Sequence, residues 1–306
     1  MIHEYHSHGK FLLTGEYLVL KGALALALPL KFGQSLEVEE LDSNNNRLHW
    51  EAYRPEGKWF SVTLNRENLS DFSTNDPEKA MRLSEILQAV KQLNSKAFEG
   101  KDLKFTTHLD FDPNWGLGSS STLIANLAQW AKVNPYELLK LTFGGSGYDI
   151  ACATAEQPIY YQLVGGKPQV ESIDFQPSFA DHLFFLYQGQ KQSSSKEIKA
   201  FLEKANPADL QQDIESVSEI SRAVPKCENL DEFGMLMQCH KRIISRCIGQ
   251  EPVQKRFPDF EGVLKSLGAW GGDFILAATE WTENQVREFF KKKGLEVVFG
   301  CKDIVR

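Results

Sequence analysis

The sequence predicts an α+β protein with two domains. Its 306 residues suffice for two ordinary domains with an extensive core. The balance of 42% hydrophobic and 25% charged residues is that of a soluble globular protein. The first third is rich in strand-forming residues, and the pattern changes near residue 175, where an apolar strand is followed by a long helical stretch. We therefore expect an N-terminal domain over residues 1–175 and a C-terminal domain with an antiparallel sheet over residues 176–306.

The first domain begins with strands that carry β-branched and aromatic residues. They are separated by Gly, Asn and Pro, and we place them at residues 10–20, 34–41, 46–53 and 58–64. The apolar segment 22–30, which Pro29 interrupts, is expected to be a buried strand or helix. A helix is predicted at residues 77–94, with Pro77 in its first turn and one apolar face formed by Leu83, Ile86, Leu87, Val90 and Leu93.

The remaining elements follow the same signals. A strand at residues 102–111 leads to predicted helices at 121–131 and 134–143, to a third that starts near residue 148, and to a strand at 158–166. In the second domain we predict a strand at 181–189 and three helical stretches between about 196 and 248. Two strands at 271–279 and 294–300 then bracket a helix at 283–293.

Charge and cysteine content limit the classes of partner and compartment. The net charge of −7 argues against nucleic acid or an anionic membrane as the main partner. No apolar run reaches 18 residues, so we expect no transmembrane helix. The five cysteines are scattered and odd in number, which suits free thiols and predicts a cytoplasmic protein.

A Gly/Ser turn at residues 116–122, with the sequence GLGSSST, runs directly into the helix predicted at 121–131. Gly116 and Gly118 allow a ligand to approach the backbone closely. The unpaired N–H groups at a helix start favour an anion, and serine hydroxyls suit phosphate oxygens or Mg²⁺. Taken alone, however, the stretch is more typical of a serine that caps a helix after a tight turn than of a phosphate site.

Two charged residues are further candidates. Asp149 follows the flexible turn GGSG at a predicted helix start, where it would cap the helix or accept a proton from a substrate hydroxyl. Lys10 stands at the entry to an apolar strand, either as a solvated surface charge or as a cation that neutralises a phosphoryl group. Taken by itself, each residue favours the simpler interpretation, which is the helix cap for Asp149 and the solvated surface charge for Lys10.

The motifs in combination resemble the GHMP kinase superfamily, which includes galactokinase, homoserine kinase, mevalonate kinase and phosphomevalonate kinase. The resemblance rests on the order of four stretches along nearly the whole chain: GKFLLTGEYLVLKGALALALP, GLGSSS, GYDIA and GAWGGD. The GYDIA tract is similar to that of a bacterial subgroup named for it, and the residues after it are similar to phosphomevalonate kinases. This resemblance implies a two-domain fold, with a left-handed crossover in the N-terminal α/β domain and a ferredoxin-like C-terminal domain.

The resemblance also implies roles for individual residues. Asp149 matches the catalytic aspartate that orients or deprotonates the acceptor hydroxyl, and Lys10 matches the lysine that pairs with it. Ser120 matches the expected Mg²⁺ contact. The loop that binds the phosphates of ATP in this family is matched by Gly116, Leu117, Gly118, Ser119, Ser120 and Ser121. The acceptor region is matched by Glu16, Tyr17, Gly268, Gly271 and Gly272.

Three positions depart from the family pattern. His8 stands where a proline is usual, and Trp270 interrupts a run of small residues in the last motif, so we expect the floor of the pocket to be reshaped there. Where some mevalonate kinases carry an additional Mg²⁺-binding glutamate, this chain has Leu138 with Glu137 beside it, and Glu137 is not assigned to the site.

The function expected from the resemblance is transfer of the ATP γ-phosphoryl group to mevalonate or 5-phosphomevalonate in isoprenoid precursor synthesis, with Mg²⁺. The alternatives are a sugar or homoserine kinase of the same superfamily, and a nucleotide-binding regulator without activity. The partners expected are the acceptor and ATP, without nucleic acid or membrane, in a monomer or a homodimer.

Overall fold

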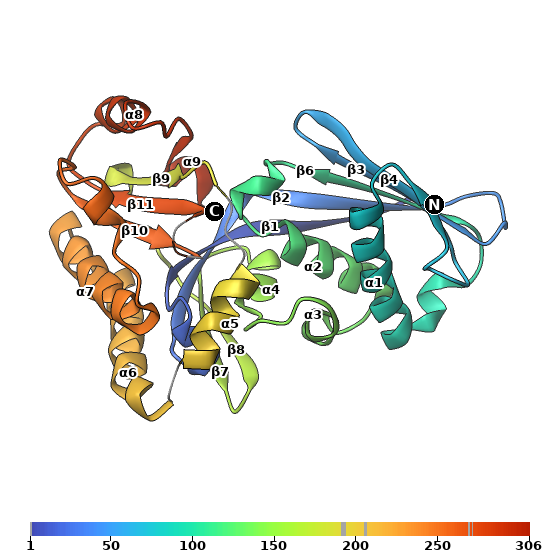
Figure 1. Ribbon diagram of the computed structural model, residues 1–306, viewed down its shortest axis with the longest axis horizontal. Coiled ribbons are helices and arrows are strands. Elements are labelled where there is room, and N and C mark those ends of the chain that lie inside the picture. Colours follow the sequence, from blue (N-terminus) through green and yellow to red (C-terminus); the bar gives the residue numbers. More distant parts are fainter. Residues whose placement is uncertain (1, 191–193, 205–206, 269, 271) are drawn as a thin grey trace. The chain divides into compact units, whose positions relative to one another are not determined.

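The computed structural model describes the chain except for residues 1, 191–193, 205–206, 269 and 271 (Figure 1). The chain forms two compact units. Unit 1 comprises Met1–Gly9, Phe32–Pro113 and Gly118–Thr154. Unit 2 comprises Lys10–Lys31, Asn114–Leu117 and Ala155–Arg306. These units reflect spatial contacts and do not coincide with the division expected at residue 175, which stays a prediction about domains.

Unit 1 is built on a sheet whose strand order is β5-β4-β3-β6-β2, with β1 paired to β2. The strands are β1 (Ile2–Thr14), β2 (Ala25–Glu40), β3 (Arg47–Arg54), β4 (Gly57–Asn65), β5 (Phe72–Thr74) and β6 (Leu103–Leu109). β3 and β6 run parallel, whereas β3 pairs with β4, and β2 with β6, in antiparallel register. In β3 the buried residues Leu48, Trp50 and Ala52 alternate with more exposed ones, as expected for a strand with one face on the core.

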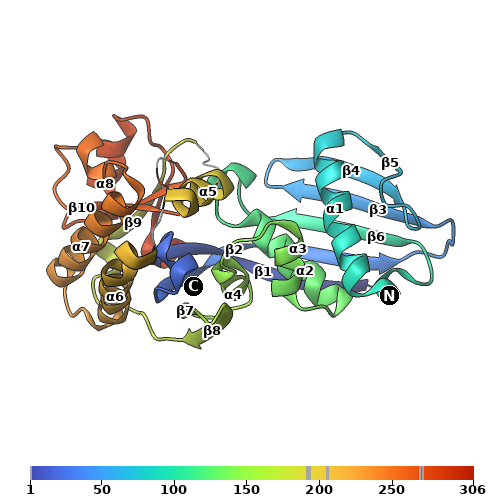
Figure 2. The ribbon, with the colours of Figure 1, turned by 60° about the horizontal axis from the view of Figure 1, so that its bottom comes forward.

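Helices cover one face of this sheet (Figure 2). They are α1 (Pro77–Leu93), α2 (Ser119–Ala131), α3 (Pro135–Thr142) and α4 (Tyr148–Ala153). Asp76 caps α1 by accepting from the Lys79 amide, and Pro77 occupies the first turn as predicted. The predicted face of α1 is confirmed, because Leu83, Ile86, Leu87 and Val90 join the core of unit 1.

Unit 2 contains a hairpin and a second sheet. The hairpin of β7 (Ile159–Val164) and β8 (Lys167–Ser172) pairs through β7 with the start of β2. The second sheet has the order β10-β11-β9-β12, with β9 (Leu183–Tyr187), β10 (Val263–Leu267), β11 (Phe274–Ala278) and β12 (Val298–Gly300). Its pairs are antiparallel, which confirms the prediction for this part of the chain.

Four helices of unit 2 agree with the predicted helical stretches: α5 (Ser194–Lys204), α6 (Pro207–Ala223), α7 (Leu230–Ile248) and α8 (Glu283–Lys291). The short helix α9 (Cys301–Ile304) was not predicted. α6 and α7 pack against each other, and α8 places Val286 and Phe290 in a core shared with the second sheet. Short 3₁₀ helices occur at η1 (Leu18–Lys21), η2 (Ser95–Phe98), η3 (Pro113–Trp115), η4 (Ala180–His182), η5 (Val224–Lys226) and η6 (Val253–Arg256).

One predicted strand is shorter than expected. The strand proposed for residues 10–20 is part of β1, which ends at Thr14, and η1 occupies Leu18–Lys21. The reason is a sharp turn in which Gly15 has φ 94° and Tyr17 has φ 62°, values that no strand can accommodate.

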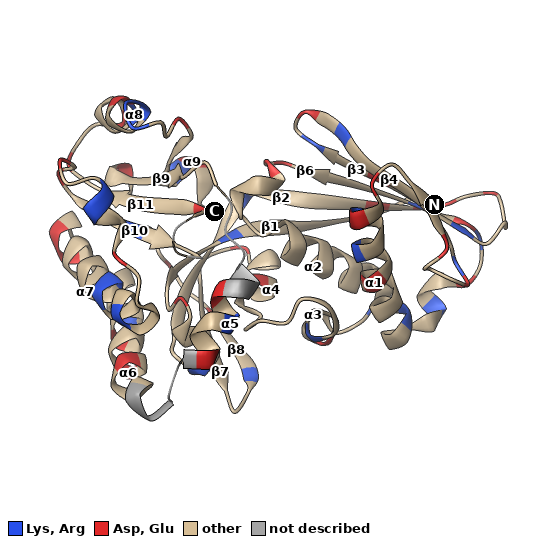
Figure 3. Cartoon of the chain, in the orientation of Figure 1, with Lys and Arg blue, Asp and Glu red and all other residues tan. Residues whose placement is uncertain are grey.

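Charged residues of both signs are interspersed along the elements of each unit (Figure 3). Within the described residues, none of the helices combines the length and the apolar character that crossing a membrane requires.

Candidate active site

The serine turn forms the N-terminus of α2. The helix begins at Ser119, and its N-cap is Gly118, with φ 104° and no side-chain cap among the described residues. The serines therefore occupy the first turn and do not cap the helix, in contrast to the simpler reading of the sequence. The first N–H groups of a helix have no intrahelical acceptor, so this end presents donors to an anion.

The three serines of this turn differ in exposure. Ser121 is buried, and its hydroxyl donates to the Gly118 carbonyl at 2.8 Å. Ser120 is exposed, and Ser119 is half-buried. Thr122, the next residue, is buried and donates to the Gln34 side chain at 2.8 Å. Of the two hydroxyls at Ser120 and Ser121, that of Ser120 is therefore the one accessible to a hard cation.

Asp149 lies in the first turn of α4, which packs against α2 within unit 1. The N-cap of α4 is Gly147, and Asp149 accepts from the amide of Ile150 at 3.0 Å, so its carboxylate is not the N-cap. Burial first, and then the charge of Asp149, raise the pKa of the Tyr136 phenol. The negative charge of Asp149 therefore acts within unit 1 on Tyr136 of α3, a helix that packs against α2.

In unit 2, Lys10 is fixed to the other half of the glycine turn. Its ammonium donates to the Gly116 carbonyl at 2.9 Å, and its backbone N–H donates to the Leu117 carbonyl at 2.9 Å. Leu117 is 1% exposed, so only its backbone is accessible to a ligand. Lys10 is therefore held by two contacts at the turn and is not a solvated surface lysine.

Glu16 and Tyr17 are both buried in unit 2. The Glu16 carboxylate forms an ion pair with Lys265, and the Tyr17 hydroxyl accepts from the backbone N–H of Trp270 at 3.2 Å. Lys265 lies 249 positions further along the chain, and no pattern in the sequence indicated it. The expected contact of Glu16 and Tyr17 with an acceptor stays a prediction.

The last glycine motif is described in part. Gly268 has φ 70°, and Gly272 is buried with its carbonyl accepting from the Gln188 side chain at 2.5 Å. Gly271, expected in the acceptor region, lies outside the described residues. The indole of Trp270 is 2% exposed and packs in a hydrophobic cluster with Phe201 and Ile244, so it fills the interior of unit 2.

Asp273 is a residue that sequence reasoning missed. It is 5% exposed and has φ 51°, which is uncommon for a residue other than glycine. A Cβ added to Gly116 would lie 2.5 Å from the Asp273 Cγ, and one added to Gly268 would lie 3.4 Å from its Oδ2. The carboxylate thus lies against two glycine turns. The available signal was an acidic residue directly after a glycine pair, before an apolar strand.

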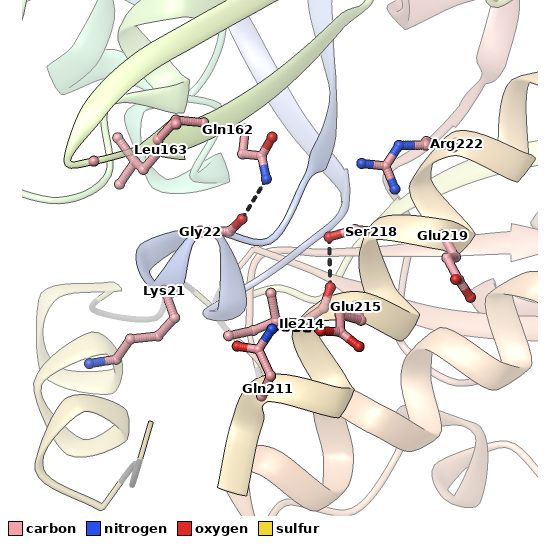
Figure 4. A pocket seen from close by; sticks show the side chains of 12 residues that line it. Lys21, Gly22, Gln162, Leu163, Gln211, Ile214, Glu215, Ser218, Glu219 and Arg222 are labelled. Atoms are coloured by element: carbon pink, nitrogen blue, oxygen red, sulfur yellow. Dashed lines mark hydrogen bonds between the residues drawn. The ribbon is translucent and has the colours of Figure 1, made fainter. Parts of the chain in front are cut away.

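A separate cavity of about 560 Å³ lies in unit 2 between the end of η1, the β7–β8 hairpin and α6 (Figure 4). Its lining includes the basic residues Lys21 and Arg222 and the acidic residues Glu215 and Glu219. Because the two signs balance, the lining does not define one class of ligand.

Comparisons with known proteins identify the fold. No protein-family model matches the sequence, and no curated protein matches it. Among solved structures, the Streptococcus pneumoniae phosphomevalonate kinase in complex with phosphomevalonate and AMPPNP has a TM-score of 0.71 and 16% identity, over 97% of this chain and 99% of that one. The Methanococcus jannaschii mevalonate kinase has a TM-score of 0.68 and 17% identity, over 98% of this chain and 96% of that one.

A kinase for a different acceptor is also similar. The D-glycero-D-manno-heptose 1-phosphate kinase of Bacteroides thetaiotaomicron has a TM-score of 0.65 and 15% identity, over 100% of this chain and 96% of that one. The chain therefore has the GHMP kinase fold, with an antiparallel four-stranded C-terminal sheet. The handedness of the crossover in the first domain stays a prediction.

Proposed function

We propose that the protein is an ATP-dependent small-molecule kinase that phosphorylates mevalonate or 5-phosphomevalonate. The observation that carries the proposal is the start of α2, where Gly118 at φ 104° leaves the first N–H groups without a side-chain cap and Ser120 exposed. A helix start of this kind favours an anion such as the phosphates of a nucleotide.

The residues present fit ATP and Mg²⁺. The backbone N–H groups of Gly116, Leu117 and Gly118 and of the first turn of α2 would hold the phosphates. Gly116 and Gly118 can adopt their positive φ because they carry no Cβ. The exposed hydroxyl of Ser120 would be an oxygen ligand of the kind Mg²⁺ prefers. ATP bound there supplies the phosphoryl group, and Mg²⁺ neutralises part of its charge.

The chain's own residues would supply positioning and charge. Asp149 would orient the acceptor hydroxyl and accept its proton, a role that suits a half-buried carboxylate in the first turn of a helix. Lys10 would place a positive charge against the transferred group, and its bond to the Gly116 carbonyl keeps the ammonium in place before the reaction. Positioning and charge stabilisation by these groups would supply most of the rate enhancement.

The choice of acceptor rests on the sequence tract after Asp149 and on the fold. The structures compared here include kinases named for mevalonate, phosphomevalonate and a heptose phosphate, so the fold is compatible with more than one acceptor. A sugar or homoserine kinase is therefore the second candidate. A regulator without activity is less favoured, because Lys10, Asp149 and the serine turn are all retained.

An acceptor panel tests the proposal. Purified protein with Mg-ATP is assayed for ADP release with mevalonate, 5-phosphomevalonate, homoserine, galactose and heptose phosphate, with Asp149→Asn as the inactive control. Turnover with either of the first two, lost in the control, supports the proposal. Turnover only with a sugar or homoserine favours the second candidate, and ATP binding without any turnover favours the regulator.

A further inference from the structure

Tyr17 has a backbone conformation that side-chain-bearing residues rarely adopt. Its φ is 62° and its ψ is −49°, which lies outside even the left-handed helical region. Conformations of this kind persist only where the surrounding structure fixes them, and they cluster at functional sites. The Leu18 N–H donates to the Glu16 carbonyl at 2.6 Å, which closes a tight turn around Tyr17. Three further contacts, made by Gly15, Glu16 and Tyr17, hold this turn in place.

The first of these contacts is made by His240 of α7. The Gly15 N–H donates to Nε2 of His240 at 2.9 Å, and the imidazole is fully buried. A ring nitrogen that accepts a hydrogen bond carries no proton, so this contact fits a neutral ring with its hydrogen on Nδ1. Among the described residues Nδ1 has no acceptor for that hydrogen. Burial, and then the charge of Lys265, hold the pKa of His240 well below its ordinary value, which agrees with this assignment. Glu16 Oε2 lies 3.3 Å from Nε2, but a neutral ring makes no ion pair there.

The second contact joins Glu16 to Lys265 of β10. Lys265 donates to Glu16 Oε1 and also to the carbonyl of Ser266 at 3.1 Å, and both side chains of the ion pair are at most 2% exposed. A buried ion pair is a weak source of stability compared with apolar residues of the same size. Its charge-assisted hydrogen bond is directional, however, and so it fixes the orientation of the groups that it joins.

The third contact involves the phenol of Tyr17 itself. Its oxygen accepts from the backbone N–H of Trp270 at 3.2 Å, and the centroid of its ring lies 5.6 Å from that of the Phe201 ring. Burial raises the pKa of Tyr17 to about 12, so the phenol keeps its proton near neutral pH. A phenol that accepts one hydrogen bond still has its own O–H to donate.

We propose that Glu16, Lys265 and His240 are positioning residues that hold the turn at Gly15 and keep Tyr17 in its strained conformation, with its hydroxyl at the last glycine motif. Glu16 acts on the acceptor through Tyr17 and does not touch it. This inference rests on the proposed function for its kinetic consequence, whereas the geometry itself is tested without turnover.

The kinetic test removes the ion pair as a unit. Replacing only one partner would leave a buried charge and threaten folding, so the variant is the double substitution Glu16→Gln with Lys265→Met. We expect the KM of the acceptor to rise by about tenfold and the KM of ATP to stay within about twofold. The matched control is Lys241→Met, which removes a different buried ammonium. Lys241 lies on α7, and it donates to the Gln254 side chain and to the Leu264 carbonyl, both at 3.0 Å. An acceptor KM in the double variant equal to that of the control overturns the proposal.

The second readout is NMR of the protein without ligands. In the wild type, ¹⁵N-labelled imidazole signals should show His240 neutral with its proton on Nδ1 between about pH 5 and 8. The ring signals of Tyr17 should shift in the double variant and not in Lys241→Met. The variants His240→Gln and Tyr17→Phe assign the His240 and Tyr17 signals, because each lacks the ring in question or its hydroxyl. A His240 that titrates near its ordinary pKa, or unshifted Tyr17 signals, contradicts the proposal.

The two readouts separate the possible failures. If the wild type phosphorylates no acceptor, the proposed function fails, and the NMR signals still decide the positioning role. If the double variant does not fold, His240→Gln takes its place: shifted Tyr17 ring signals support the positioning role, and unshifted signals overturn it.

Discussion

Replacing Gly116 by alanine should destabilise unit 2 more than its backbone conformation alone explains. Gly116 has φ 71°, and an alanine at positive φ costs about 1 kcal/mol. The new Cβ would also lie 2.5 Å from Cγ and Oδ1 of Asp273. The backbone of Asp273 is fixed, because its N–H donates to the Gln190 carbonyl at 3.0 Å and its carbonyl accepts from the Gln188 N–H at 2.8 Å. Relief must therefore come from rotation of a side chain that is only 5% exposed. Overpacking against a fixed group costs about 1–3 kcal/mol. We therefore expect a total of about 2–4 kcal/mol.

The assay is urea unfolding of Gly116→Ala beside a matched control, Gly294→Ala. Gly294 lies in the same unit with φ 82°, and none of the described atoms lies within 4 Å of an added Cβ there. The control therefore includes the cost of an alanine at positive φ but not the close contact with the Asp273 carboxylate. If both unfolding curves have the same slope, the difference between their urea midpoints measures the cost of that contact. Adding Asp273→Gly to Gly116→Ala should recover part of the loss, because the carboxylate is gone. Equal losses in Gly116→Ala and Gly294→Ala would refute the placement of the carboxylate.

Three further predictions concern single residues of unit 1. Asp149→Asn should lower kcat by about 10²–10⁴ while calorimetry shows unchanged ATP affinity; unchanged turnover would rule out proton transfer by this residue. Ser120→Ala should raise the Mg²⁺ concentration needed for half-maximal rate. The control Ser121→Ala should not, because the Ser121 hydroxyl donates to the Gly118 carbonyl. Equal responses of the two variants would contradict the metal assignment.

The last of the three is Asp102→Asn. Burial by itself would raise the pKa of Asp102. Hydrogen bonds from the backbone N–H groups of Arg47 and Asn45 and from the Ser43 hydroxyl outweigh this effect and lower the pKa to about 2. Because the folded pKa is depressed, this stability is present above about pH 4 and lost as pH falls towards 2. The variant should therefore lose about 2 kcal/mol of unfolding free energy at pH 7, and a difference that persisted at pH 2 would contradict the assignment.

Periodic segments of the fold were predictable from the sequence, and segments set by distant contacts were not. The 3.6-residue period of α1 and the proline at its start gave its position and its buried face. β10 was missed because the segment VLKSL is too short for a clear period and contains Lys265, which reads as a surface residue until its partner Glu16 is known. β8 was missed for a different reason, since each of its residues is exposed and its polar sequence resembles a loop.

The candidate site was predictable as a set of motifs and not as a geometry. The glycines and serines of residues 116–122 indicated an anion site at a helix start, and the uncapped start of α2 fits that interpretation. The sequence could not show that the Ser121 hydroxyl turns to the Gly118 carbonyl while Ser120 is exposed, because this follows from which side of the first helical turn is buried. It could not reveal Asp273 either, whose carboxylate lies against a turn more than 150 positions earlier in the chain.

Adjacent residues of one motif can therefore serve different purposes, and burial separates them. In the turn at Gly15, Glu16 has a buried partner for its charge, so its replacement should act first on the geometry of the turn. Ser120 is exposed at a helix start, so its replacement should act on the ligand and leave the fold unchanged. A variant of Glu16 that loses activity would not by itself make this carboxylate a ligand of the acceptor. Only a measurement that reports Tyr17 separately from turnover distinguishes a residue that binds from one that holds its neighbour in place.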